Sequence, residues 1–153
     1  METKEAIYHY CNYQERCQQQ VRDKLYSLGC HPGEVEAIIA DLIEKGLVNE
    51  ERFARAIARG KFRMNKWGRI KIIQQLKQHR ISDYCIKIGL REIDEEEYFQ
   101  TLRRLAAAKW MELKEEKNIF AKKAKVFRYL QQKGFERELI TDSIDTIQLK
   151  STE

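Results

Sequence analysis

Residues 25–30, Leu-Tyr-Ser-Leu-Gly-Cys, recur twice in altered form: residues 76–81 read Leu-Lys-Gln-His-Arg-Ile, and residues 130–135 read Leu-Gln-Gln-Lys-Gly-Phe. The leading leucines are 51 and 54 residues apart. Gly29 and Gly134 occupy the position at which a helix ends in a left-handed residue, and Arg80 takes that position in the middle copy. The pattern therefore predicts repeated units that each contain a helix, a tight turn and a second helix.

Cap residues predict a further helix in the first two units. Asn49 can cap a helix that starts at Glu50, and Asp94 with Glu97 has the spacing of a capping box, with a helix running to about Glu116. We therefore predict an all-α fold of tandem three-helix repeats that form an elongated, curved array. The predicted bounds are a leading helix in 1–15, repeat 1 in 16–66, repeat 2 in 67–117, and a two-helix partial repeat 3 with a tail in 118–153.

Composition agrees with a helical, cytoplasmic protein. The 153 residues include 1 Pro and 7 Gly, which argues against a β-sandwich with many turns. No apolar stretch approaches the roughly 18 residues that a membrane span needs. The four cysteines, Cys11, Cys17, Cys30 and Cys85, match no common zinc spacing, so we expect free, buried or half-buried thiols.

Charge is concentrated in the middle of the chain. Residues 1–50 carry 5 basic and 9 acidic side chains, whereas residues 51–91 carry 12 basic and 2 acidic side chains, net +10. No acidic residue occurs between Arg55 and Arg80. A solvated helix face usually intersperses acidic residues that pair with its cations, so this run favours contact with a polyanion or an acidic protein surface.

We assign a binding role to this run. Phe62 and Trp67 interleave with the cations, as in proteins that stack bases on aromatic side chains, but either ring could instead be a core residue. The candidate binding residues are Arg55, Arg59, Lys61, Arg63, Lys66, Trp67, Arg69, Lys71, Lys77 and Arg80.

Catalytic motifs are missing from the sequence. It contains no G-x-S-x-G, P-loop or H-E-x-x-H pattern, and its three histidines fall in three different predicted elements. We expect no enzymatic activity, no catalytic residues, no cofactor and no metal.

Three segments in order resemble the RecX family of recombination regulators. Residues 42–54, Leu-Ile-Glu-Lys-Gly-Leu-Val-Asn-Glu-Glu-Arg-Phe-Ala, are similar to its "L-x-x-x-G-[YL]-[LIV]-[DN]-[DE]-x-R-F-A" signature. Residues 67–76 with Ile81-Ser82 are similar to its second-repeat segment, and residues 133–136 to its third-repeat turn. Arg80 departs from the family pattern, which usually has Gly there.

The resemblance implies a partner and an activity. It implies a protein that binds the RecA recombinase filament on single-stranded DNA and inhibits strand exchange, ATP turnover and co-protease activity, thereby modulating recombination and DNA repair. We expect a monomer with weak, non-specific DNA binding of its own. The alternative is a free-standing helical DNA-binding module of helix-turn-helix type, which would bind duplex DNA with a sequence preference.

Overall fold

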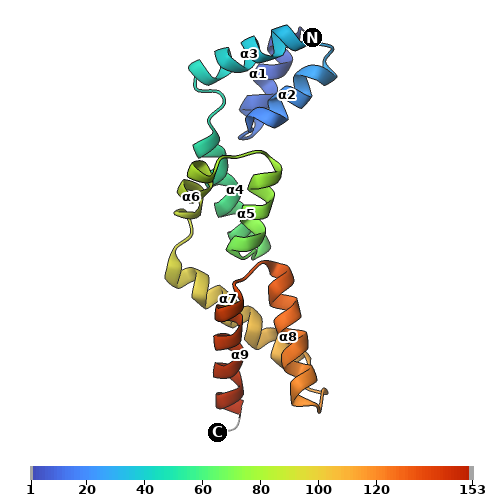
Figure 1. The fold of residues 1–153 in the computed structure, drawn as a ribbon, viewed down its shortest axis with the longest axis vertical. Coiled ribbons are helices and arrows are strands. Elements are labelled where there is room, and N and C mark those ends of the chain that lie inside the picture. The colour runs from blue at the N-terminus through green and yellow to red at the C-terminus, as the bar shows by residue number, and fades with distance from the viewer. Residues whose placement is uncertain (1, 152–153) are drawn as a thin grey trace. The chain divides into compact units, whose positions relative to one another are not determined.

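Nine α-helices and no strand form the part of the chain that the structure describes, residues 2–151 (Figure 1). The coordinates are a computed structural model. This architecture confirms the all-α prediction, while the elongation and curvature of the array stay predictions. The helices are α1 (Thr3–Tyr13), α2 (Gln18–Ser27), α3 (Pro32–Glu44), α4 (Glu50–Asn65), α5 (Arg69–Gln78), α6 (Asp83–Leu90), α7 (Glu95–Glu112), α8 (Ile119–Lys133) and α9 (Arg137–Ser151).

The three repeated turns share one hydrogen-bond pattern. In each turn the sixth residue donates its backbone N–H to the carbonyl of the leading leucine: Cys30 to Leu25 at 3.1 Å, Ile81 to Leu76 at 3.1 Å, and Phe135 to Leu130 at 3.2 Å. The fifth residue is left-handed in every copy, with φ +86° in the first, +59° in the second and +98° in the third. These bonds close helices α2, α5 and α8 in the way that the sequence repeat predicts.

Both predicted N-caps are present. The Asn49 side chain accepts a 3.0 Å hydrogen bond from the Arg52 backbone N–H, and Asp94 accepts one of 3.0 Å from Glu97. Helix α7 stops at Glu112, four residues before the predicted end. The prediction was too long because Glu116 is used in the following turn, where its carboxylate accepts hydrogen bonds from Asn118 N and Lys125 Nζ.

The chain divides into two compact units that do not coincide with the repeats. The first unit comprises the chain up to Ile57 together with Gln75–Glu92, and the second comprises Ala58–Gln74 and the chain from Ile93 onward. Helices α4 and α5 therefore contribute one end to each unit.

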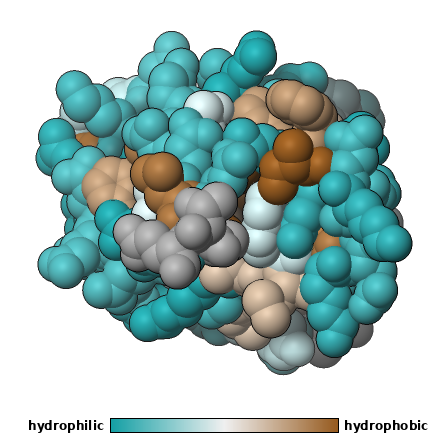
Figure 2. Space-filling model, turned by 90° about the horizontal axis from the view of Figure 1, so that it is seen from below, coloured by the Kyte–Doolittle hydropathy of each residue, from teal (hydrophilic) through white to brown (hydrophobic). Residues whose placement is uncertain are grey.

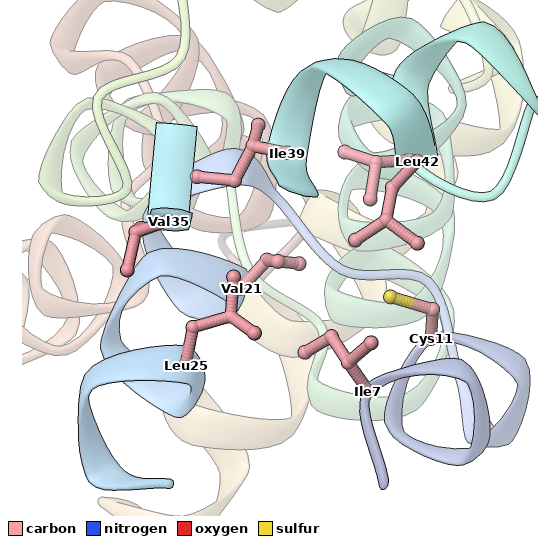
Figure 3. Packing of buried hydrophobic residues seen from close by; sticks show 8 residues of the cluster. Ile7, Cys11, Val21, Leu25, Val35, Ile39 and Leu42 are labelled. Atoms are coloured by element: carbon pink, nitrogen blue, oxygen red, sulfur yellow. The ribbon is translucent and has the colours of Figure 1, made fainter. Parts of the chain in front are cut away.

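One hydrophobic cluster of the first unit lies among α1, α2 and α3. Val21 and Leu25 of α2 face Ile39 and Leu42 of α3, and Ile7 of α1 lies beside them (Figure 3). All five side chains are at most 3% exposed. Each contributes about 1.5–3 kcal/mol relative to an exposed position, which stabilises the three-helix packing.

In the second unit, Tyr98 of α7 is the central core residue. Its ring is fully buried and lies 5.7 Å from the Phe62 ring and 5.2 Å from the Phe135 ring, measured between centroids. Leu130 of α8 and Ile140 of α9 are also fully buried. This core holds the end of α4 and the start of α5 against the turn between α8 and α9.

Candidate functional site

The short segment between α4 and α5 has an unusual backbone. Lys66 is left-handed with φ +58°, although it is not glycine. Trp67 N–H donates to the Lys61 carbonyl at 3.1 Å, six residues back in sequence and one residue further than in the three repeated turns. A left-handed lysine costs about 1–2 kcal/mol, and such strained residues cluster at functional sites. The sequence predicts a junction between two helices here, but the left-handed conformation of Lys66 was missed because no glycine marks that position.

Two lysines enclose the Trp67 indole. Lys61 Nζ lies 4.9 Å and Lys71 Nζ 4.4 Å from the ring centroid, and the indole is half-buried. Both ammonium groups gain cation–π stabilisation that holds them at the surface. Because two ammonium groups already lie over the ring, this geometry suits phosphate or carboxylate ligands better than base stacking.

Phe62 is a core residue. Its side chain is 3% exposed and packs on Tyr98, so the core alternative holds for this ring. Trp67 matches neither a core residue nor an exposed stacking ring, because its side chain is half-buried.

Exposed cations continue this site along the end of α4. Arg63 and Lys66 are both exposed, and Lys66 Nζ donates to the Arg63 carbonyl at 2.8 Å. Lys133 Nζ donates to the Asn65 carbonyl at 3.0 Å. Cations at a helix C-terminus are stabilised by the helix dipole, which offsets part of their mutual repulsion. We call the set Lys61, Arg63, Lys66, Trp67 and Lys71 the basic junction.

Arg69 has a different environment. Its guanidinium lies 4.0 Å from the Tyr98 ring centroid, Nη1 lies 2.7 Å from Glu136 Oε2, and the side chain is 25% exposed. Nη2 also lies 4.0 Å from a carboxylate oxygen of Glu95. The Tyr98 hydroxyl donates to the other oxygen of Glu136. Burial, and then this hydrogen bond to Glu136, raise the pKa of Tyr98. Arg69 is thus held within the fold of the second unit.

The start of α5 offers no free anion site. Gly68 N–H donates to the Lys133 carbonyl at 2.7 Å, Arg69 N–H to the Tyr98 hydroxyl at 2.9 Å, and Ile70 N–H to the Gly134 carbonyl at 2.9 Å. A helix N-terminus binds anions through unpaired N–H groups, and these three are already used. The positive charge of the site therefore comes from side chains.

The remaining predicted residues are dispersed. Arg55, Lys77 and Arg80 belong to the first unit, where Arg55 Nη1 lies 3.9 Å from a carboxylate oxygen of Glu92. Arg59 belongs to the second unit and is exposed. The structure brings together Lys61, Trp67 and Lys71, with Arg63 and Lys66 on the same turn, as a candidate binding site for phosphate or carboxylate groups.

Comparison with known families identifies the repeats. Family models for the first, second and third three-helix domains of RecX match residues 4–42, 49–90 and 95–144, in that order. The chain belongs to the RecX family. The RecX domains correspond to α1–α3, α4–α6 and α7–α9. The sequence-based bounds group these helices differently, with a leading helix and a two-helix end, and they stay a prediction.

Curated relatives support this assignment. The "Regulatory protein RecX" of Lactobacillus johnsonii is 31% identical over 149 residues, covering 94% of this chain and 53% of the relative. That of Clostridium perfringens is 30% identical over 122 residues, covering 79% of this chain and 57% of the relative. The chain thus spans about half the length of the curated RecX proteins it matches.

Solved RecX structures share the fold. The crystal structure of RecX from Lactobacillus salivarius matches with a TM-score of 0.84 at 26% identity, covering 95% of this chain and 94% of that one. A second, the crystal structure of regulatory protein RecX, has a TM-score of 0.81 at 22% identity and shows the likeness of fold alone. No helix in residues 2–151 combines the length and apolar character needed to cross a membrane.

Proposed function

We propose that this chain is a regulatory protein that binds the RecA recombinase filament on single-stranded DNA and inhibits its ATP hydrolysis, strand exchange and co-protease activity. The observation that carries the proposal is the ordered match of all three RecX domains over residues 4–144. RecX relatives are named regulatory proteins, and a regulator of a nucleoprotein filament must recognise either the filament protein or its nucleic acid.

The basic junction is the proposed contact. Arg63 and Lys66 are exposed, and the ammonium groups of Lys61 and Lys71 are held against Trp67. Fixed cations lose less side-chain entropy on binding than free lysines do, so they suit phosphates or surface carboxylates. Such a contact weakens with salt, because counterions compete with it.

The test is RecA-dependent ATP hydrolysis on single-stranded DNA, measured as the protein is titrated in. The double variant Arg63→Glu/Lys66→Glu should lose inhibition by at least about tenfold in half-maximal concentration, because two attractive contacts become repulsive. The matched control is Lys114→Glu/Lys117→Glu, which makes the same charge change at exposed residues of the turn before α8. Equal inhibition by both folded variants would refute the role of the basic junction.

Arg69 is unsuitable for this test. Its guanidinium is bonded to Glu136 and packs on Tyr98, so replacing it would lower stability and confuse a binding defect with unfolding. Arg63 and Lys66 avoid this problem because both side chains face solvent.

The alternative function, a free-standing duplex-binding module, makes a distinct prediction. It requires tight, sequence-selective binding of labelled duplex DNA without RecA. We expect weak and non-selective binding, because charge held by lysines recognises the phosphate backbone and carries little sequence information. Selective binding at physiological salt would favour the alternative.

A further inference from the structure

A hollow between α7 and α9 lies outside the basic junction. It has a volume of about 410 Å³, and its floor and walls include Ala107, Trp110, Met111 and Ile147. A smaller hollow of about 210 Å³ continues it and shares the side chains of Arg103, Ser143 and Thr146. All of these residues belong to the second unit.

The floor of this hollow is apolar and partly open to solvent. Trp110 is 6% exposed and forms the base, whereas Met111 is 66% exposed and Ala107 is also exposed. Figure 2 looks onto the end of the molecule where α9 finishes, and hydrophobic side chains come to the surface there between hydrophilic ones. A flexible methionine beside an exposed alanine can adapt to the side chains of a partner.

The rim of the hollow is basic. Arg103 and Arg104 of α7 and Lys150 of α9 line the larger hollow, which no acidic residue lines, whereas Asp142 lines the smaller one. Within residues 2–151, no ion pair engages any of these three cations. By contrast, Lys125 of the neighbouring α8 is paired with Glu116. The three rim charges are therefore available to a ligand.

The combination of floor and rim selects one kind of ligand. Nucleic acid would satisfy the cations, but the buried Trp110 cannot stack on a base and an apolar floor gains nothing from phosphate. An amphipathic helix would bury apolar side chains on the floor and place its carboxylates on the rim. The distance from Arg103 to Met111 along α7 is about 12 Å, or just over two helical turns, which matches anchors at i, i+4 and i+7.

We propose that the hollow between α7 and α9 is a docking groove for an acidic amphipathic helix of a partner protein. The groove uses residues of the second unit only and is independent of the basic junction, so it stands or fails separately from the proposed function. Charge complementarity between the rim and the helix fixes which face of the partner is presented.

The experiment uses the full chain and two synthetic peptides of about 18 residues, long enough to form a helix. The first carries leucines at helical spacing with glutamates elsewhere, and the second replaces every glutamate with lysine. Fluorescence anisotropy should show that the glutamate peptide binds, and that the lysine peptide binds at least about tenfold more weakly. No binding of the glutamate peptide, or equal binding of both peptides, would overturn the proposal.

Variants locate the binding. Arg103→Glu/Arg104→Glu should lower the affinity for the glutamate peptide by at least about tenfold. Lys114→Glu/Lys117→Glu makes the same change of net charge and should leave that affinity unchanged. Ala107→Arg should also block binding by filling the floor. In a Trp67→Phe background Trp110 is the one remaining tryptophan of the 2 in the sequence, so its emission should shift when peptide binds. If Lys114→Glu/Lys117→Glu lost peptide affinity to the same extent, the effect would come from net charge and not from the groove.

Two competing occupants have their own signatures. If a second copy of the chain fills the groove, sedimentation will show a dimer that Ala107→Arg dissociates. If nucleic acid fills it, a labelled single-stranded oligonucleotide will lose affinity with Arg103→Glu/Arg104→Glu and will displace the peptide. Either result would refute the docking of a partner helix. Circular dichroism of each variant establishes that it is folded before binding is measured.

Discussion

Arg69 and Glu136 form an ion pair across 67 positions of sequence, with 2.7 Å between Arg69 Nη1 and Glu136 Oε2. The first residue of α5 is thereby fixed to the residue that precedes α9. The Tyr98 hydroxyl donates to the same carboxylate and accepts from the Arg69 backbone N–H, so one side chain from α7 closes the arrangement. These three residues form a polar latch inside an otherwise apolar core.

Removing the Arg69 guanidinium should destabilise the protein. Arg69→Gln leaves the Glu136 carboxylate without its cation, and we expect a loss of roughly 2 kcal/mol in the free energy of unfolding, in the range for hydrogen bonds to charged groups. Urea denaturation followed by circular dichroism measures it. Lys117→Gln, at an exposed position, is the control and should change stability by less than about 0.5 kcal/mol. Equal stability of the two variants would show that the latch contributes nothing.

Tyr98 should make stability fall at high pH. The pKa of Tyr98 is raised above its usual value of 10.0 by burial and by the Glu136 hydrogen bond. Above pH 10 the unfolded chain releases this proton while the folded chain keeps it. The free energy of unfolding therefore falls as the pH rises. The slope from this one group is at most about 1.4 kcal/mol per pH unit.

The Tyr98→Phe variant isolates that contribution. Lysines and other tyrosines titrate in both proteins, so the difference between their stabilities is the informative quantity. We expect the difference to be constant below pH 9 and to shrink above pH 10. A difference that stays constant to pH 11 would mean that Tyr98 ionises normally in the folded protein.

Gly134 should tolerate alanine less well than Gly29. Both are left-handed, so each alanine variant carries the conformational strain of about 1 kcal/mol. A Cβ on Gly134 would lie 2.4 Å from the Cβ of Lys71 and 2.6 Å from its backbone nitrogen, whereas a Cβ on Gly29 meets nothing within 4 Å. We expect Gly134→Ala to cost at least about 2 kcal/mol more than Gly29→Ala in thermal or urea unfolding. Equal losses would mean that the turn before α9 can shift away from α5.

The four cysteines should react with thiol reagents in two classes. Cys11 and Cys17 are buried, and burial raises the pKa of both thiols. Cys30 and Cys85 are half-buried. A disulfide reagent at pH 8 should label Cys30 and Cys85 first, and Cys11 and Cys17 at a rate limited by opening of the core. Mass spectrometry of partly labelled protein identifies the order, and early labelling of Cys17 would contradict the packing around α2.

The sequence predicts the turns well because their signal is local. Glycine at 29 and 134 and the caps Asn49 and Asp94 each act within a few residues, so all four appear in the structure as expected. The free, buried or half-buried state of the cysteines is confirmed as well.

The candidate site was harder to predict because charge patterns do not specify contacts. Arg69 belongs to the basic run, yet its guanidinium is bonded to Glu136, a residue far away in sequence. Ile70 fits the helical spacing of core residues but is 41% exposed, while its neighbour Ile72 is fully buried. The α7–α9 groove carries no motif, since it depends on how two helices pack.

Helices α4 and α5 contribute to both compact units, and this has a consequence for how such proteins fold and evolve. The middle RecX domain is complete as a sequence module, but its hydrophobic residues are shared between two cores. Cutting the chain at either boundary of the middle domain would divide one of the two units, so we expect the folding units to be offset from the sequence repeat. Adding or deleting one repeat therefore also changes the hydrophobic core that the neighbouring repeat shares with it.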